Sequence, residues 1–100
     1  MTLVVLLTVR PDAVDAFRAF EHAAAQIMAA HGGVIERAIA VPPTESGAPY
    51  REVHIVTFPS AAALAAYRAD PALRALAPQR ESSVLHTEVL YGEAGPEYGR

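Results

Sequence analysis

Two histidine–glutamate pairs are the candidate catalytic groups of this sequence. Glu52 and His54 lie two apart in one apolar segment, and His86 and Glu88 lie two apart in another. Residues i and i+2 of a β-strand share a face, and an imidazole titrates near neutrality, so such pairs suit proton transfer. Side chains two apart on a strand are about 7 Å from each other, so a water or a ligand should bridge Glu52 and His54. His54 is the candidate acid/base, and Glu52 and His86 complete the catalytic set.

Four further side chains are candidates for substrate binding, and each also has a structural interpretation. The polar ones could serve as ion-pair partners or rim groups, and the aromatic one as a core residue. His54 itself could be a core or interface histidine whose hydrogen bonds are satisfied. Arg80, before the last apolar segment, is another possible polar wall residue. The four candidates are Tyr67, Arg37, Phe17 and Tyr50.

Metal and cofactor chemistry finds little support in the sequence. His54 and His86 should lie about 9.5 Å apart across one intervening strand, which is too far for one metal ion but suits opposite ends of a small-molecule pocket. No His-x-His or His-x₃-His pair occurs. The chain has no Cys and no Lys, which excludes disulfides, thiolate nucleophiles and lysine Schiff bases. We therefore expect neither a metal nor a cofactor.

Length and charge limit the class of protein further. One hundred residues correspond to one domain. A net charge of −3 with eight basic residues argues against nucleic-acid binding, which requires a basic surface. The apolar run near the N-terminus is too short to span a bilayer. The expected location is the cytoplasm.

The hydrophobic pattern predicts alternating strands and helices. A long helix follows the first strand, because apolar residues recur there every three or four positions. Ser60 and Asp70-Pro71 are typical helix starts, and Pro78 should limit the second of these short helices. Residues 1–92 form the predicted domain, and 93–100 a flexible tail. The strands are expected at Leu3–Val9, Val34–Val41, Tyr50–Phe58 and Val84–Tyr91, and the long helix at Pro11–His31, ended by Gly32-Gly33.

This order is β-α-β-β-α-β, which predicts a ferredoxin-like α+β fold with an antiparallel four-stranded sheet. In such a fold the helices cover one face of the sheet. Here Leu3–Val9 is apolar on both faces, and Val53 and Ile55 alternate with Val56 and Phe58. A second copy of the chain would cover the remaining apolar face. We therefore predict a homodimer through the sheet faces.

Several segments together resemble those of a known superfamily. They are His31-Gly32-Gly33, the run from His54 to Ser60, the run from Ala66 to Pro71, and Thr87 to Leu90. With these segments the chain resembles the dimeric α/β-barrel superfamily, and most closely its small uncharacterised bacterial members related to the antibiotic-biosynthesis monooxygenases. The resemblance implies a dimeric α/β barrel, shared by cofactor-free oxygenases, isomerases, haem enzymes and proteins with no assigned activity.

Two functions from different classes remain open at this point. The first is a dimer that binds a small molecule or has no catalytic role, in which the histidines serve packing. The alternative is a cofactor-independent, monooxygenase- or isomerase-like enzyme that acts on a small organic substrate with His54 as acid/base. A cavity of several hundred Å³ with His54 or His86 in its wall would favour the enzyme.

Overall fold

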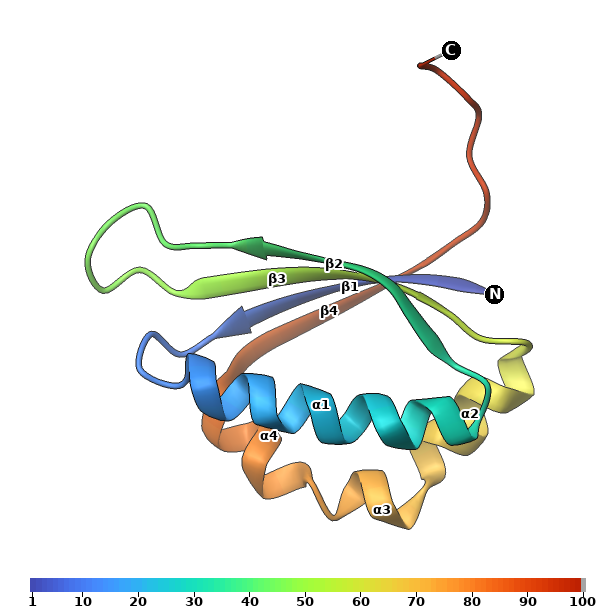
Figure 1. Cartoon of the computed structure of the whole chain (residues 1–100), viewed down its shortest axis with the longest axis horizontal. Coiled ribbons are helices and arrows are strands. Elements are labelled where there is room, and N and C mark those ends of the chain that lie inside the picture. The colour runs from blue at the N-terminus through green and yellow to red at the C-terminus, as the bar shows by residue number, and fades with distance from the viewer. Residues whose placement is uncertain (100) are drawn as a thin grey trace.

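A four-stranded antiparallel sheet forms one layer of the molecule, and helices form the other (Figure 1). The computed structural model describes residues 1–99. The sheet has the order β2-β3-β1-β4, so the ferredoxin-like α+β prediction is confirmed. The elements are β1 (Thr2–Val9), α1 (Val14–Ala30), β2 (Val34–Val41), β3 (Tyr50–Thr57), α2 (Ala61–Ala69), α3 (Pro71–Arg74), α4 (Ala77–Ser83) and β4 (Val84–Gly92).

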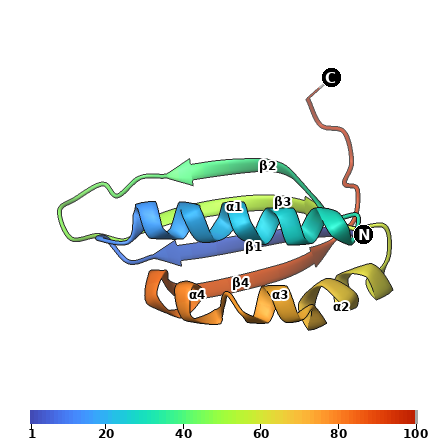
Figure 2. The same ribbon diagram turned by 60° about the horizontal axis from the view of Figure 1, so that its bottom comes forward.

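All the helices cover the same face of the sheet. In Figure 2, α1 lies in front of the central strands, and α2, α3 and α4 follow one another along β4. Alternate residues of β1 and β3 point into this layer and bury their apolar side chains against the helices. The core forms two clusters, one around Phe17, Phe20 and Val9 and the other around Met28, Phe58 and Leu64.

The end of α1 depends on two glycines with different roles. Gly32 has φ +76°, the left-handed conformation that non-glycine residues resist. This confirms the predicted glycine cap. Gly33 has no room for a side chain, because a Cβ there would overlap Cγ of Met28 and lie 2.6 Å from Cε1 of Phe58. The turn therefore brings the start of β2 into close contact with the core.

The segment after α2 differs from the sequence prediction. Asp70 caps α3 as expected, and its Oδ1 accepts from the Ala72 N–H at 2.9 Å. Pro78, however, lies in the first turn of a third short helix, α4, which the sequence analysis did not predict. Proline is tolerated at that position because the first-turn N–H groups have no helical partner. Pro78 was expected to end a helix, but it lies at the start of one.

The face of the sheet turned away from the helices is largely apolar and uncovered. Directly paired residues of neighbouring strands share a face, so the pairs Leu6–Val53 and Val4–Ile55 extend across β1 and β3. Ile39 and Leu90, on the outer strands, are 43% and 49% exposed. We call this the open face. Its apolar members are Val4, Leu6, Val34, Ile39, Val41, Val53, Ile55 and Leu90.

Residues 93–99 follow β4 without helix or strand and extend away from the domain (Figure 1). Arg100, the last residue of the predicted flexible tail, lies outside the described residues. Within residues 1–99, none of the helices combines the length and the apolar character needed to cross a membrane.

Candidate functional site

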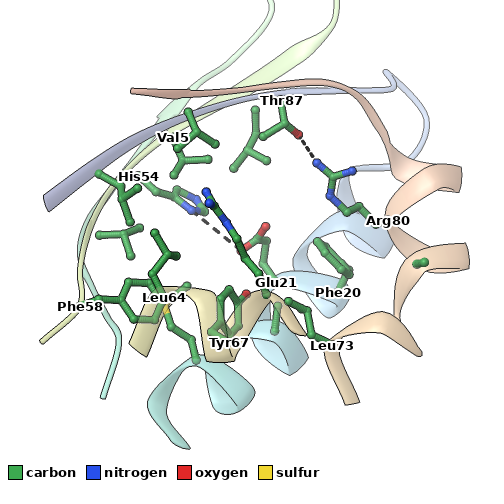
Figure 3. Close-up of a pocket in the computed structure, with 18 residues that line it drawn as sticks. Val5, Phe20, Glu21, His54, Phe58, Leu64, Tyr67, Leu73, Arg80 and Thr87 are labelled. Atoms are coloured by element: carbon green, nitrogen blue, oxygen red, sulfur yellow. Dashed lines mark hydrogen bonds and ion pairs between the residues drawn. The ribbon is translucent and has the colours of Figure 1, made fainter. Parts of the chain in front are cut away.

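A cavity of about 340 Å³ lies between the sheet and the helix layer (Figure 3). Its wall is mostly apolar, built by β1, β3 and β4 on one side and by α1 and α2–α4 on the other. Pockets that bind small molecules span about 300–1,000 Å³ and combine apolar walls with a few polar groups. The polar or charged residues of the wall are Glu21, His54, Tyr67, Arg68, Arg80 and Thr87.

His54 lies on this wall and is fixed from behind by Glu52. Its imidazole is 4% exposed, and its Nε2 is 2.7 Å from Oε1 of Glu52. The sequence analysis was wrong to expect a bridging water or ligand, because the two side chains lean toward each other and bond directly. The other carboxylate oxygen of Glu52 accepts a hydrogen bond from the Tyr50 hydroxyl. An ionised carboxylate has no proton to donate, so Nε2 of His54 donates and Nδ1 is left for other partners.

Glu21 on α1 is the residue nearest to that second nitrogen, and the sequence analysis missed it. Its Oε2 is 3.9 Å from Nδ1 of His54, too long for a hydrogen bond but close enough for an ion pair. Burial raises the pKa of Glu21, as does the charge of Glu52, whereas His54 and Arg80 oppose the shift. One signal could have identified it: Glu21 is four residues after Phe17 and three before Ala24, so a carboxylate interrupts the apolar stripe.

Three further polar residues of the cavity wall are Arg80, Thr87 and Tyr67. Arg80 Nη2 donates to Oγ1 of Thr87 at 2.6 Å. Burial raises the pKa of Tyr67 to about 12, so its phenol keeps its proton at neutral pH. Tyr67 also packs against Phe58, with ring centroids 5.5 Å apart. Tyr67 and Arg80 therefore lie in the cavity wall, and their part in substrate binding stays a prediction.

His86 and Arg37 lie on the open face, so neither shares a pocket with His54, which corrects the expectation that His86 lies at the opposite end of the same pocket. His86 pairs with Thr8, and Arg37 pairs with Ile55, whereas His54 pairs with Val5 and points to the helices. A β-bulge between β1 and β4 and another between β2 and β3 are the cause, because one extra residue turns the following side chains to the other face.

The last two candidates, Phe17 on α1 and Tyr50 on β3, are buried between the sheet and the helices but lie outside the cavity wall. Phe17 is fully buried in the core beside Val9. Tyr50 is also buried, with the guanidinium of Arg18 5.6 Å from its ring centroid. Tyr50 thus acts on the site only through Glu52. Within residues 1–99, no group of three or more metal-ligating side chains is placed to hold a metal ion.

A contact between helices supports the Tyr67 side of the cavity. His31, at the end of α1, has its Nε2 2.8 Å from Oδ2 of Asp70, at the junction of α2 and α3. The imidazole also meets the Tyr67 ring edge-on, with centroids 6.3 Å apart. The bond to His31, followed by the Ala72 N–H, holds the pKa of Asp70 below its usual value. His31 therefore joins the two halves of the helix layer.

The comparison with protein families agrees with this architecture. The model of the domain of unknown function DUF1330 matches residues 3–91. The chain belongs to this family. No curated protein matches it.

Solved structures with the same fold include proteins of unknown function and oxygenases, and all of them resemble this DUF1330 chain in fold alone. A protein of unknown function from Rhodopseudomonas palustris has a TM-score of 0.72 at 19% identity, over 95% of this chain and 83% of that one. SnoaB, a cofactor-independent oxygenase from Streptomyces nogalater, has a TM-score of 0.64 at 17% identity, over 96% of each chain. A candidate antibiotic biosynthesis monooxygenase from Nitrosomonas europaea has a TM-score of 0.67 at 14% identity, over 92% and 96%.

Proposed function

We propose that this protein binds a small, mostly apolar organic molecule in the cavity between sheet and helices. The observation that carries the proposal is a cavity of about 340 Å³ whose walls are apolar apart from a few polar groups, with His54 and Tyr67 among them. The Tyr67 hydroxyl makes no hydrogen bond within residues 1–99, so it is available to a ligand.

A neutral probe tests this binding. We expect 3-phenylpropan-1-ol to bind saturably in calorimetric titrations, because its ring and hydroxyl match an apolar wall with polar groups. Val89→Phe fills the cavity from β4 and should weaken binding at least tenfold. Leu85→Phe, on the same strand but outside the cavity wall, is the matched control and should bind as the wild type. Absence of saturable binding, or unchanged binding by a folded Val89→Phe variant, would contradict the proposal.

Proton transfer by His54 is the second candidate function, favoured by one specific observation. Glu52 holds Nε2 of His54 at 2.7 Å, and Nδ1 is on the side of Glu21 and the cavity. A carboxylate that fixes the tautomer of a histidine leaves its other nitrogen free to act as a base. SnoaB, of the same fold, is a cofactor-independent oxygenase. In this role His54 would remove a proton from the bound molecule.

Exchange of carbon-bound hydrogen detects such a base without knowledge of the substrate. In D₂O the base would take a proton from the carbon beside the carbonyl of 4-phenylbutan-2-one, and a deuteron from solvent would replace it. We expect the protein to accelerate this exchange, followed by NMR, and His54→Gln to abolish the acceleration. His22→Gln, exposed on the outer side of α1, should leave it unchanged. Equal acceleration by wild type and His54→Gln would overturn the acid/base role.

A second copy of the chain is the proposed partner of the open face. Eight apolar residues from all four strands lie on that face, and Ile39 and Leu90 are more than two-fifths exposed. A monomer seldom exposes so continuous an apolar surface. A two-fold dimer would bury the same face on both copies at once.

A further inference from the structure

The arginine side of the cavity has more hydrogen-bond donors than the protein uses. Arg80 donates one hydrogen bond to Thr87, and a guanidinium has five N–H donors. Within residues 1–99, neither Arg80 nor Arg68 has a carboxylate oxygen within 4.0 Å. Arg68 lies instead 5.7 Å from the ring centroid of Tyr91. Neither guanidinium therefore forms an ion pair within residues 1–99, although the charge of Arg80 lowers the pKa of Glu21 in the same wall.

The charges that line the cavity leave a positive surplus. Arg68 and Arg80 contribute two positive charges to the wall and Glu21 contributes at most one negative charge, so the wall keeps a positive surplus even when Glu21 is ionised and His54 is neutral. Glu52 lies behind His54. It lies outside the cavity wall, whereas Arg68 and Arg80 belong to it. An anion would compensate the surplus, and a cation would increase it.

Arg80 lies across the cavity from part of its apolar wall, although Phe20 is on the same side as Arg80 (Figure 3). Figure 3 shows Arg80 and Thr87 on one side, with Phe58 and Leu64 on the other. The Tyr67 phenol, whose pKa is about 12, is a further proton donor on this wall. A ligand with one charged end and one apolar end fits this division.

We propose that the natural ligand is a small carboxylate with an apolar body, whose carboxylate is held by Arg80 while the body contacts Phe58 and Leu64. This inference rests on the proposed binding function and specifies its ligand class. Arginine suits the role because its planar fork can donate two parallel hydrogen bonds to a carboxylate.

Three probes with the same body and different head groups test the inference. They are 3-phenylpropanoate, 3-phenylpropan-1-ol and 3-phenylpropylammonium, titrated calorimetrically into the whole chain near neutral pH. We expect the carboxylate to bind about tenfold more tightly than the alcohol, and the ammonium more weakly than either, because only the carboxylate can form an ion pair with Arg80 through two parallel hydrogen bonds.

A pair of arginine variants locates the head group. Arg80→Gln should lower the affinity for the carboxylate about tenfold, to that for the alcohol, and leave the alcohol unaffected. Arg74→Gln removes the same charge from α3, outside the cavity wall, and should preserve the carboxylate preference. Circular dichroism establishes that both variants are folded.

The outcomes separate the two proposals. If the alcohol and the carboxylate bind equally, or if folded Arg80→Gln keeps the preference, the carboxylate inference is wrong and the binding function stands. If the ammonium binds most tightly, Glu21 is the anchor and the inference is also wrong. If none of the three probes binds, the proposed binding function fails and the inference with it.

Discussion

His54 has two carboxylates beside it, and their different surroundings divide their roles. Glu52 accepts from both Tyr50 and His54, so it orients the imidazole. Glu21 has no hydrogen bond within residues 1–99 and faces the cavity. Burial raises its pKa, which means that the folded chain holds the Glu21 proton more strongly than the unfolded chain does.

The raised pKa of Glu21 predicts that the free energy of unfolding decreases as this carboxyl loses its proton. Stability falls as pH rises from the ordinary carboxyl pKa of 4.5 through the folded value, because the folded state binds more protons in that window. Glu21→Gln cannot titrate, so its stability should rise relative to wild type as the pH rises from 4.5 through the folded pKa of Glu21. Urea unfolding across this range measures the difference, with Glu93→Gln on the exposed tail as control. A difference that does not change with pH would contradict this.

Gly33 offers a second prediction at the scale of one residue. Gly33→Ala would place a methyl group within 3 Å of Met28 and Phe58, so the core must shift. Overpacking of this kind costs about 1–3 kcal/mol. Gly95→Ala, which has open space around it, should change the free energy of unfolding by less than about 0.5 kcal/mol. Chemical denaturation of the two variants tests the contrast, and equal losses would show that no close contact exists at Gly33.

Neighbouring side chains could be predicted where they lie on the same strand at a fixed spacing. They could not be predicted where the neighbours come from different elements that meet only in the folded chain. His54 with Glu52 was recognisable from spacing alone, because alternate residues of a strand share a face. Their direct bond was not, since it depends on rotamers. Glu21 became a cavity residue only because its turn of α1 faces the sheet beside His54.

The secondary structure elements followed closely from hydrophobic periodicity and caps. The bounds of β2 coincide with the prediction, and those of β1, β3 and β4 differ by one residue at an end. The missed helix α4 has the polar sequence of residues 79–83, so it lacks an apolar stripe that could reveal it. Contacts with α1 and β4 give it a place in the fold.

The contact between His31, at the end of α1, and Asp70, between α2 and α3, should contribute less to stability in acid. The bond to His31 lowers the pKa of Asp70, so this group stabilises the fold above its unfolded pKa of 3.8 and loses that contribution as pH falls through the folded value. Asp70→Asn can still accept from the Ala72 N–H, yet it cannot form the ion pair. We expect it to be less stable than wild type near neutral pH and to lose less stability on acidification.

Thermal unfolding at several pH values measures this effect. Asp12→Asn, an exposed residue in the turn before α1, removes the same charge outside the junction and should follow the wild-type profile. A wild-type profile for Asp70→Asn would mean that the contact between His31 and Asp70 does not contribute to stability.

At the scale of the whole molecule, the open face predicts the oligomeric state. Sedimentation should give a species of twice the 10.6 kDa chain mass. Ile39→Lys adds a charge to this face and should shift the equilibrium to the monomer, because a buried unpaired ammonium is strongly unfavourable. Ala62→Lys, on the exposed side of α2, should remain dimeric. A wild type that stays at 10.6 kDa at all concentrations would exclude the dimer.

Residue type and local spacing were enough to predict the four strands, the long helix, the caps at Ser60, Asp70 and Gly32, the two apolar faces of the sheet, and the pairing of His54 with Glu52 on one face. Which other residues contact one another depends on the folded chain. The two bulges moved Arg37 and His86 to the open face, and the packing of α1 brought Glu21 to His54. Strand register is a long-range property, and a shift of one residue exchanges the faces of a strand, so no local pattern can contain this information.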